Sequence, residues 1–187
     1  MINNYLSNVK QQFEYYKSVG DKTFTQLEDQ HFFIQHNPES NSIAIIVNHM
    51  WGNMMSRWTD FLTTDGEKDF RKRDEEFDDV IRTKNELIKK WEEGWKCLFS
   101  ALNSIDQNNF DNTVYIRNQA HTITEAINRQ MMHYAYHVGQ IVTLAKIHKN
   151  GSFISLTIAK GKSKAFNDEK FSRGKHNGHF SDDLESL

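Results

Sequence analysis

Residues 125–148 read EAINRQMMHYAYHVGQIVTLAKIH, and this stretch decides the fold. It carries no aspartate, glutamate, lysine or arginine between Arg129 and Lys146, although 26% of the chain is charged. Its apolar residues recur at intervals of three and four, the spacing of one helix face. They are Ile127, Met131, Tyr134, Val138, Ile141, Val142 and Ala145. A helix with so few charges belongs largely inside the protein.

Short polar signals mark the two ends of this helix. Thr122 and Glu125 have the spacing of a capping box, which satisfies the first free backbone N–H groups. At the other end, Asn150 and Gly151 follow a last turn rich in basic residues, which suits the negative end of the helix dipole. The sequence therefore predicts a helix over 123–149.

The same helix presents a second, polar line of residues, formed by His133, His137 and Gln140. Histidines four residues apart point to the same side of a helix and can bind one metal ion together. Gln140, one turn further on, is a candidate for orienting a ligand or a bound water. A helix–helix hydrogen bond is its alternative role.

A third histidine lies on another uncharged segment. No charged residue occurs from Ser40 to Ser56, and apolar residues there again follow helical spacing, so we expect a second buried helix over 42–63. His49 lies beside its apolar face. Alone it would be a hydrogen-bonded core residue, but together with His133 and His137 it becomes a candidate third metal ligand.

Composition limits the class of protein. With 187 residues, one proline and nine glycines, the chain fits a single all-α domain with a substantial core. A net charge of −2 and a pI near 6.5 exclude a basic surface for nucleic acid. The single cysteine, Cys97, forms no internal disulfide, which favours a reducing, cytoplasmic location. No apolar run is long enough for a membrane span.

The remaining segments give the domain plan. Helical periodicity predicts further helices over 2–28 and 83–105, and alternation within 112–122 predicts a short strand or hairpin. The four helices should pack as one domain over 1–160, with the second and fourth innermost. Residues 161–187 form a polar tail that we expect to be partly disordered.

The segment between the second and third helices, residues 63–82, carries charges of alternating sign. One interpretation is a solvated linker held by its own ion pairs, each of which contributes little when exposed. The other is that Arg71 and Arg73 face an anionic group of a substrate, because arginine suits planar anions.

Three other kinds of metal site fit poorly. A zinc-protease helix needs glutamate after its first histidine, where Tyr134 stands. A di-iron bundle needs two Glu-x-x-His helices, and only Glu28 and His31 have that spacing. A zinc knuckle needs more cysteines than one. The residues leave two alternatives open: a three-histidine mononuclear site, or three hydrogen-bonded core histidines.

Beyond these arguments, the chain resembles a known superfamily. Asn48-His49-Met50, followed by the His133-x-x-x-His137-x-x-Gln140 pattern, is similar to the DinB/YfiT-like superfamily of metal-dependent enzymes. Longer stretches resemble one subfamily of uncharacterised bacterial proteins within it. These stretches are 52–62, 65–68, 71–77, 133–141 and 155–163.

The resemblance implies an up-down four-helix bundle, often dimeric, in which His49, His133 and His137 hold one divalent metal ion. Its relatives include transferases that join thiols such as bacillithiol to electrophiles. We therefore expect a metal-dependent enzyme that acts on a small molecule, as a thiol S-transferase or a hydrolase. Zinc or nickel is expected first, with iron or manganese as alternatives, because imidazole suits most of these ions and availability often decides among them. The alternative is a non-catalytic bundle that binds a metal or ligand.

A homodimer is expected as well. Four tryptophans, Trp51, Trp58, Trp91 and Trp95, give the helices more aromatic surface than one small bundle needs. The resemblance favours the same assembly. The partners implied are thus a small-molecule substrate, for example a low-molecular-weight thiol, and a second copy of the chain.

Overall fold

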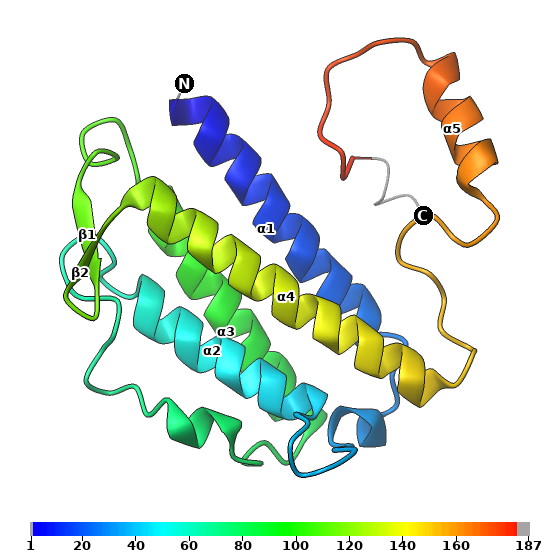
Figure 1. Ribbon diagram of the computed structural model, residues 1–187, viewed down its shortest axis with the longest axis horizontal. Coiled ribbons are helices and arrows are strands. Elements are labelled where there is room, and N and C mark those ends of the chain that lie inside the picture. Colours follow the sequence, from blue (N-terminus) through cyan, green and yellow to red (C-terminus); the bar gives the residue numbers. More distant parts are fainter. Residues whose placement is uncertain (1, 183–187) are drawn as a thin grey trace.

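The computed structural model describes residues 2–182 of the protein, and most of them are helical, as the all-α prediction requires. The four long helices are α1 (Ile2–Phe24), α2 (Ile43–Trp58), α3 (Lys84–Asn103) and α4 (Ile123–Lys149). They lie side by side around one core (Figure 1). Helix α2 packs on α3 and α1 packs on α4, while α2 also contacts α4 and α1 also contacts α3.

The predicted helix over 123–149 is confirmed at both ends. The Thr122 side chain accepts a hydrogen bond from the Glu125 backbone N–H, and the Glu125 carboxylate accepts one from the Thr122 backbone N–H in return. At the other end Asn150 adopts a left-handed conformation, with φ of 43°. Local hydrogen bonds thus fix where α4 begins and ends.

The other helices are shorter than predicted, because their last residues enter loops that pack on the core. Helix α1 ends at Phe24, and Asp29–Phe32 forms a separate 3-10 helix, η1. Helix α2 ends at Trp58, since Thr59 is extended and Asp60 has a φ of 47°. Apolar periodicity continues through such loops, so it overestimates the helix length.

The two uncharged helices are buried to different degrees. Nearly every residue of α2 is buried, as predicted for an innermost helix. Helix α4 buries one face and exposes another, on which Met132 and Tyr136 are 69% and 63% exposed. Three of the four tryptophans, Trp58, Trp91 and Trp95, are buried within the chain itself and offer no surface to a second copy, whereas Trp51 is half-buried. The homodimer stays a prediction.

A two-stranded hairpin precedes α4, as predicted. Strands β1 (Thr113–Ile116) and β2 (Gln119–Thr122) are antiparallel. Arg117 and Asn118 form the turn with φ values of 55° and 59°, and their backbone N–H groups donate to the Asp65 carboxylate. Asp65 thereby attaches the loop after α2 to the hairpin turn.

That loop, residues 59–83, is not the solvated linker of the first interpretation. It contains the short 3-10 helix η2 (Asp74–Phe77), which packs on α2. The Arg71 side chain is only 2% exposed and that of Glu76 only 7%. The loop is therefore part of the structure that surrounds the histidines.

The tail leaves the body of the protein after α4 (Figure 1). It contains a helix, α5 (Ser163–Ser172), that the sequence interpretation did not foresee, and none of its residues is buried. The Phe180 ring packs on Tyr15, with ring centroids 5.1 Å apart. Residues 183–187 of the predicted tail lie outside the described residues. Among residues 2–182, no helix combines the length and apolar character that a membrane crossing requires.

Candidate metal centre

The three predicted histidines meet at one place. His49 comes from α2, whereas His133 and His137 come from successive turns of α4. The His133 Nε2 atom lies 3.2 Å from His49 Nε2 and 3.0 Å from His137 Nε2. Within residues 2–182 they are the only group of three or more His, Cys, Asp or Glu side chains whose ligand atoms are close enough to hold one ion.

The other ring nitrogen of each histidine faces a side-chain oxygen. His49 Nδ1 lies 2.9 Å from a Glu76 carboxylate oxygen, and His137 Nδ1 lies 2.8 Å from the Gln140 amide oxygen. His133 Nδ1 lies 3.4 Å from the Gln130 amide oxygen. An ionised carboxylate can only accept, so His49 carries its proton on Nδ1. His133 and His137 can likewise donate a proton from Nδ1 to the glutamine oxygens. In these tautomers every Nε2 atom keeps its lone pair, and the three lone pairs are directed at one another.

Burial keeps the two α4 histidines uncharged. It lowers the pKa of His133 to about 3, with additional effects from His137 and His49. It also lowers the pKa of His137 to about 4, although the hydrogen bond with Gln140 acts in the opposite direction. Neutral imidazole is the form that binds metal ions, so these side chains are ready to act as ligands at neutral pH.

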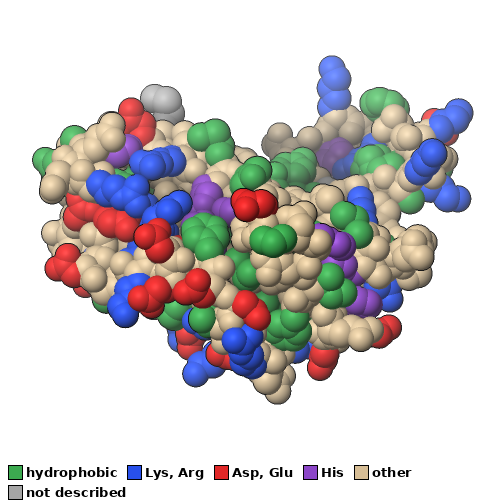
Figure 2. Space-filling view, turned by 60° about the horizontal axis from the view of Figure 1, so that its bottom comes forward, with side chains coloured by type: hydrophobic (Ala, Val, Ile, Leu, Met, Phe, Trp, Pro, Cys, Tyr) green, Lys and Arg blue, Asp and Glu red, His purple; other side chains and the backbone are tan. Residues whose placement is uncertain are grey.

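A divalent ion fits this arrangement. Three imidazole nitrogens at the usual distance from one tetrahedral ion lie about 3.4 Å apart. The two separations from His133 Nε2 are close to this value, and all three ligand atoms lie within 4.8 Å of one another. Three lone pairs that face one another repel, and a cation between them removes that repulsion. His133 is only partly buried, so the remaining ligand position opens toward the surface. Histidine side chains reach the surface on the face shown in Figure 2.

Glu76 is the residue that sequence reasoning missed. Its carboxylate accepts from His49 and from two nitrogens of Arg71, at 2.7 and 2.9 Å, while its backbone carbonyl accepts from Asn48. Although burial raises the Glu76 pKa, the hydrogen bonds from His49 and Arg71 hold it below the ordinary value. A carboxylate–histidine pair of this kind fixes the tautomer and orientation of a metal ligand.

One signal in the sequence could have revealed this contact. Gly52 stands in the middle of α2, where glycine weakens a helix and so indicates a close approach. A Cβ atom at Gly52 would lie 2.4 Å from a carboxylate oxygen of Glu76. The absence of a side chain at position 52 is what lets Glu76 reach His49.

Other predicted partners lie elsewhere. Asn53, one turn after His49 on α2, accepts from the Tyr134 hydroxyl at 2.9 Å. Within residues 2–182, Gln140 makes no helix–helix hydrogen bond, since its amide oxygen lies 2.8 Å from His137 Nδ1 on the same helix. Its predicted role toward a ligand or bound water stays a prediction. Arg71 is occupied by Glu76 and Glu67, and Arg73 lies over the Phe77 ring, so the two do not together form an anion site.

The remaining histidines are not part of this centre. The His36 and His31 rings stack on His148, with ring centroids 5.0 and 6.0 Å apart. His176 and His179 lie in the tail, beyond α5.

The fold and the site together define an all-α protein with a candidate three-histidine metal centre. The chain belongs to the family described as "Protein of unknown function (DUF1572)", whose model matches residues 1–162. That match covers the four long helices and all three histidines. No curated protein and no solved structure matches the chain.

Proposed function

We propose that His49, His133 and His137 bind one divalent metal ion in an up-down four-helix bundle of the DinB/YfiT-like type. The observation that carries the proposal is the convergence of three Nε2 atoms whose rings are fixed from behind by Glu76 and two glutamines. Core histidines that merely needed hydrogen bonds would not direct three lone pairs at one point. We propose zinc or nickel, with iron or manganese as alternatives, since imidazole suits most of these ions.

The chemistry proposed is that of a thiol S-transferase or a hydrolase that acts on a small molecule. A divalent ion held by three neutral imidazoles keeps its positive charge and lowers the pKa of a bound water or thiol. The chain supplies the surroundings: Glu76 holds the proton on His49 Nδ1, and the Phe77 ring stacks on His49 with centroids 4.6 Å apart. Gln140 also borders an open hollow of about 710 Å³, which none of the three histidines lines.

An activity screen of metal-loaded protein tests this proposal. One arm follows conjugation of mercaptoethanol to monobromobimane, and the other follows hydrolysis of p-nitrophenyl acetate. We expect one arm to exceed both the metal-free protein and the His133→Ala variant by at least about tenfold, the scale of a metal-activated nucleophile. Stoichiometric metal without turnover in either arm would favour the second candidate, a non-catalytic metal-binding bundle.

A homodimer is also proposed, on a different basis from the tryptophans. Met132 and Tyr136 lie one turn apart on the uncharged, exposed face of α4, where a second copy could cover them. Sedimentation at micromolar concentration should then give twice the 22.0 kDa mass of one chain. A single 22.0 kDa species would overturn the dimer without affecting the metal site.

A further inference from the structure

Arginine side chains from four different segments gather beside the metal centre. They are Arg57 of α2, Arg71 of the following loop, Arg117 of the hairpin turn and Arg129 of α4. A single Glu67 oxygen lies 3.6 Å from Arg57, 3.0 Å from Arg71 and 3.3 Å from Arg117. One carboxylate cannot neutralise three guanidinium groups.

The count leaves positive charge in excess. Arg71 is neutralised by Glu76, with which it makes two hydrogen bonds. Glu67 then remains as the carboxylate for Arg57 and Arg117. Arg129 contacts no carboxylate within residues 2–182, and its one hydrogen-bond partner there is His121, at 3.5 Å. Three arginines thus share one acid, which leaves two positive charges uncompensated.

The nearby Asp65 and Lys68 do not change this balance, since their charges cancel. The Asp65 carboxylate accepts from the backbone N–H groups of Glu67, Arg117 and Asn118, and not from a guanidinium. The Lys68 ammonium group donates to backbone carbonyls of Ser56 and Asp65. The charges of Asp65 and Lys68 both act on Arg57, and they do so in opposite directions.

Arg57 is the least satisfied of the four. The residue is 4% exposed, and its Nε atom is buried without a hydrogen-bond partner. Its best contact is the 2.7 Å hydrogen bond that it donates to the Gly66 carbonyl. Burial, and then the charge of Arg71, lower its pKa. A buried guanidinium whose charge is not fully balanced by a nearby anion costs roughly several kcal/mol of stability. A bound anion would remove that cost.

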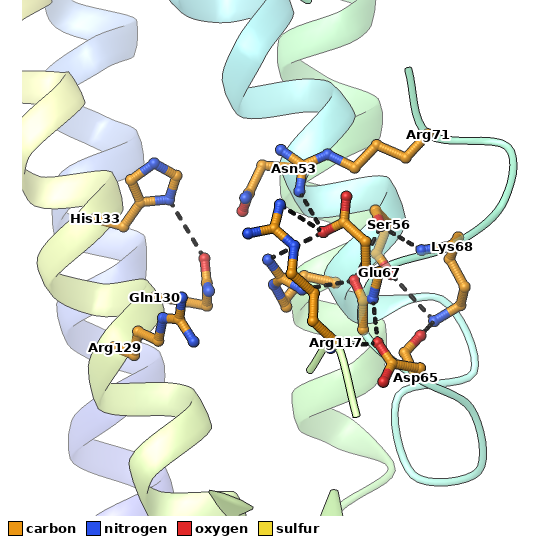
Figure 3. A network of polar contacts seen from close by, with 12 residues as sticks. Asn53, Ser56, Asp65, Glu67, Lys68, Arg71, Arg117, Arg129, Gln130 and His133 are labelled. Atoms are coloured by element: carbon orange, nitrogen blue, oxygen red, sulfur yellow. Dashed lines mark hydrogen bonds and ion pairs between the residues drawn. The ribbon is translucent and has the colours of Figure 1, made fainter. Parts of the chain in front are cut away.

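The excess charge borders the partly exposed side of the histidines. Figure 3 shows the Arg117 side chain extending from the hairpin toward the side of α4 that carries Arg129, Gln130 and His133. One Glu76 oxygen lies 2.9 Å from both Arg71 and His49, so Arg71 is separated from the centre by a single carboxylate. On the outer surface, basic side chains gather next to histidines in Figure 2. The ligand position of the centre therefore opens beside this group of arginines.

We propose that the three-histidine centre takes a small molecule that carries an anionic group, a carboxylate or a phosphate, held by Arg117 and Arg129 beside His133. Arg57 lies behind them and contributes its charge from within the core. The guanidinium fork matches the geometry of both oxyanions. This inference rests on the proposed metal centre and narrows its substrate class.

Thiols of different charge test the inference on cobalt-loaded protein, because a thiolate bound to cobalt gives a charge-transfer absorption. The neutral probe is mercaptoethanol, the cationic probe is cysteamine, and the anionic probes are mercaptopropionate and mercaptoethylphosphonate. We expect the tighter anionic probe to bind about tenfold more tightly than mercaptoethanol, the effect of one or two charge-assisted contacts. Cysteamine should bind most weakly. The comparison between the two anionic probes identifies the oxyanion.

The Arg117→Gln/Arg129→Gln double variant should lose the preference for anionic thiols and keep its affinity for mercaptoethanol. Both residues are exposed, so the fold should tolerate the change. Arg82→Gln/Lys89→Gln, on exposed side chains at α3, removes the same charge and should leave the preference intact. Equal affinity for charged and neutral thiols, or an anion preference that survives the first double variant, would overturn the inference. A protein that binds no cobalt would instead overturn the metal centre itself.

Discussion

Replacement of Gly52 by alanine should destabilise the protein, although the same change stabilises most helices. The added Cβ would lie 2.4 Å from Glu76 Oε1 and 2.8 Å from Glu76 Cδ, far inside contact distance. The carboxylate has little freedom to move away. Its Oε1 accepts from Arg71 Nε at 2.7 Å, and its Oε2 accepts from both Arg71 and His49 at 2.9 Å.

Two opposing effects decide whether the Gly52→Ala substitution stabilises or destabilises the protein. Alanine is favoured over glycine within a helix by about 1 kcal/mol. Displacing Glu76 breaks its buried ion pair with Arg71 and leaves Arg71 with Glu67 alone, which costs at most about 3–5 kcal/mol. We therefore expect the free energy of unfolding to fall by up to about 2–4 kcal/mol. Because His49 also loses its acceptor, metal affinity should fall about 10–100-fold.

Urea unfolding followed by circular dichroism measures the change in stability. Gly139→Ala is the matched control, since α4 leaves open space around that position and nothing lies within 4 Å of an added Cβ. This control should be as stable as the natural protein or up to about 1 kcal/mol more stable. A Gly52→Ala protein that matches its control would refute the fixed position of Glu76 and its role behind His49.

Two further predictions concern the core around the site. The metal-free protein should lose stability as the pH falls from about 6.5 to about 4. In this range His133 and His137 are protonated in the unfolded chain but stay neutral in the folded protein, because their pKa values are lowered there. Each group should lower the free energy of unfolding by at most about 1.4 kcal/mol per pH unit. Urea unfolding across this pH range should show a smaller pH dependence of stability in the His133→Gln/His137→Gln variant than in the natural protein. An equal pH dependence in the two proteins would contradict the prediction. Tyr134→Phe should cost about 1–3 kcal/mol, since it leaves Trp58 Nε1 without its buried acceptor. Tyr136→Phe, on an exposed side chain, is its control in thermal unfolding and should have little effect.

Much of the fold could be predicted from local patterns. The capping box at Thr122 and the basic last turn located α4 to the residue, because these signals act through hydrogen bonds between near neighbours. The convergence of His49 with the α4 histidines could be predicted too, since both buried helices had to share one core. Periodicity could not show that Trp58, Trp91 and Trp95 pack inside the chain.

The surroundings of the histidines were harder to predict. Glu76 and Arg71 lie in a segment of alternating charge that has no helical period, and such a segment usually faces water. Their burial depends on contacts with α2 that are distant in sequence. Only Gly52, a helix-weakening residue inside an otherwise well-formed helix, pointed to a close neighbour at that place.

The central claim is that His49, His133 and His137 share one metal ion. Its most direct test is the metal content of the purified, zinc-loaded protein and of the three single alanine variants after dialysis. We expect one ion per chain in the natural protein. The His133→Ala and His137→Ala variants should retain almost none and His49→Ala should retain far less, all with unchanged helical content, because the apolar core does not need the metal to fold. Stoichiometric zinc in all three variants would place the ligands elsewhere and contradict the account.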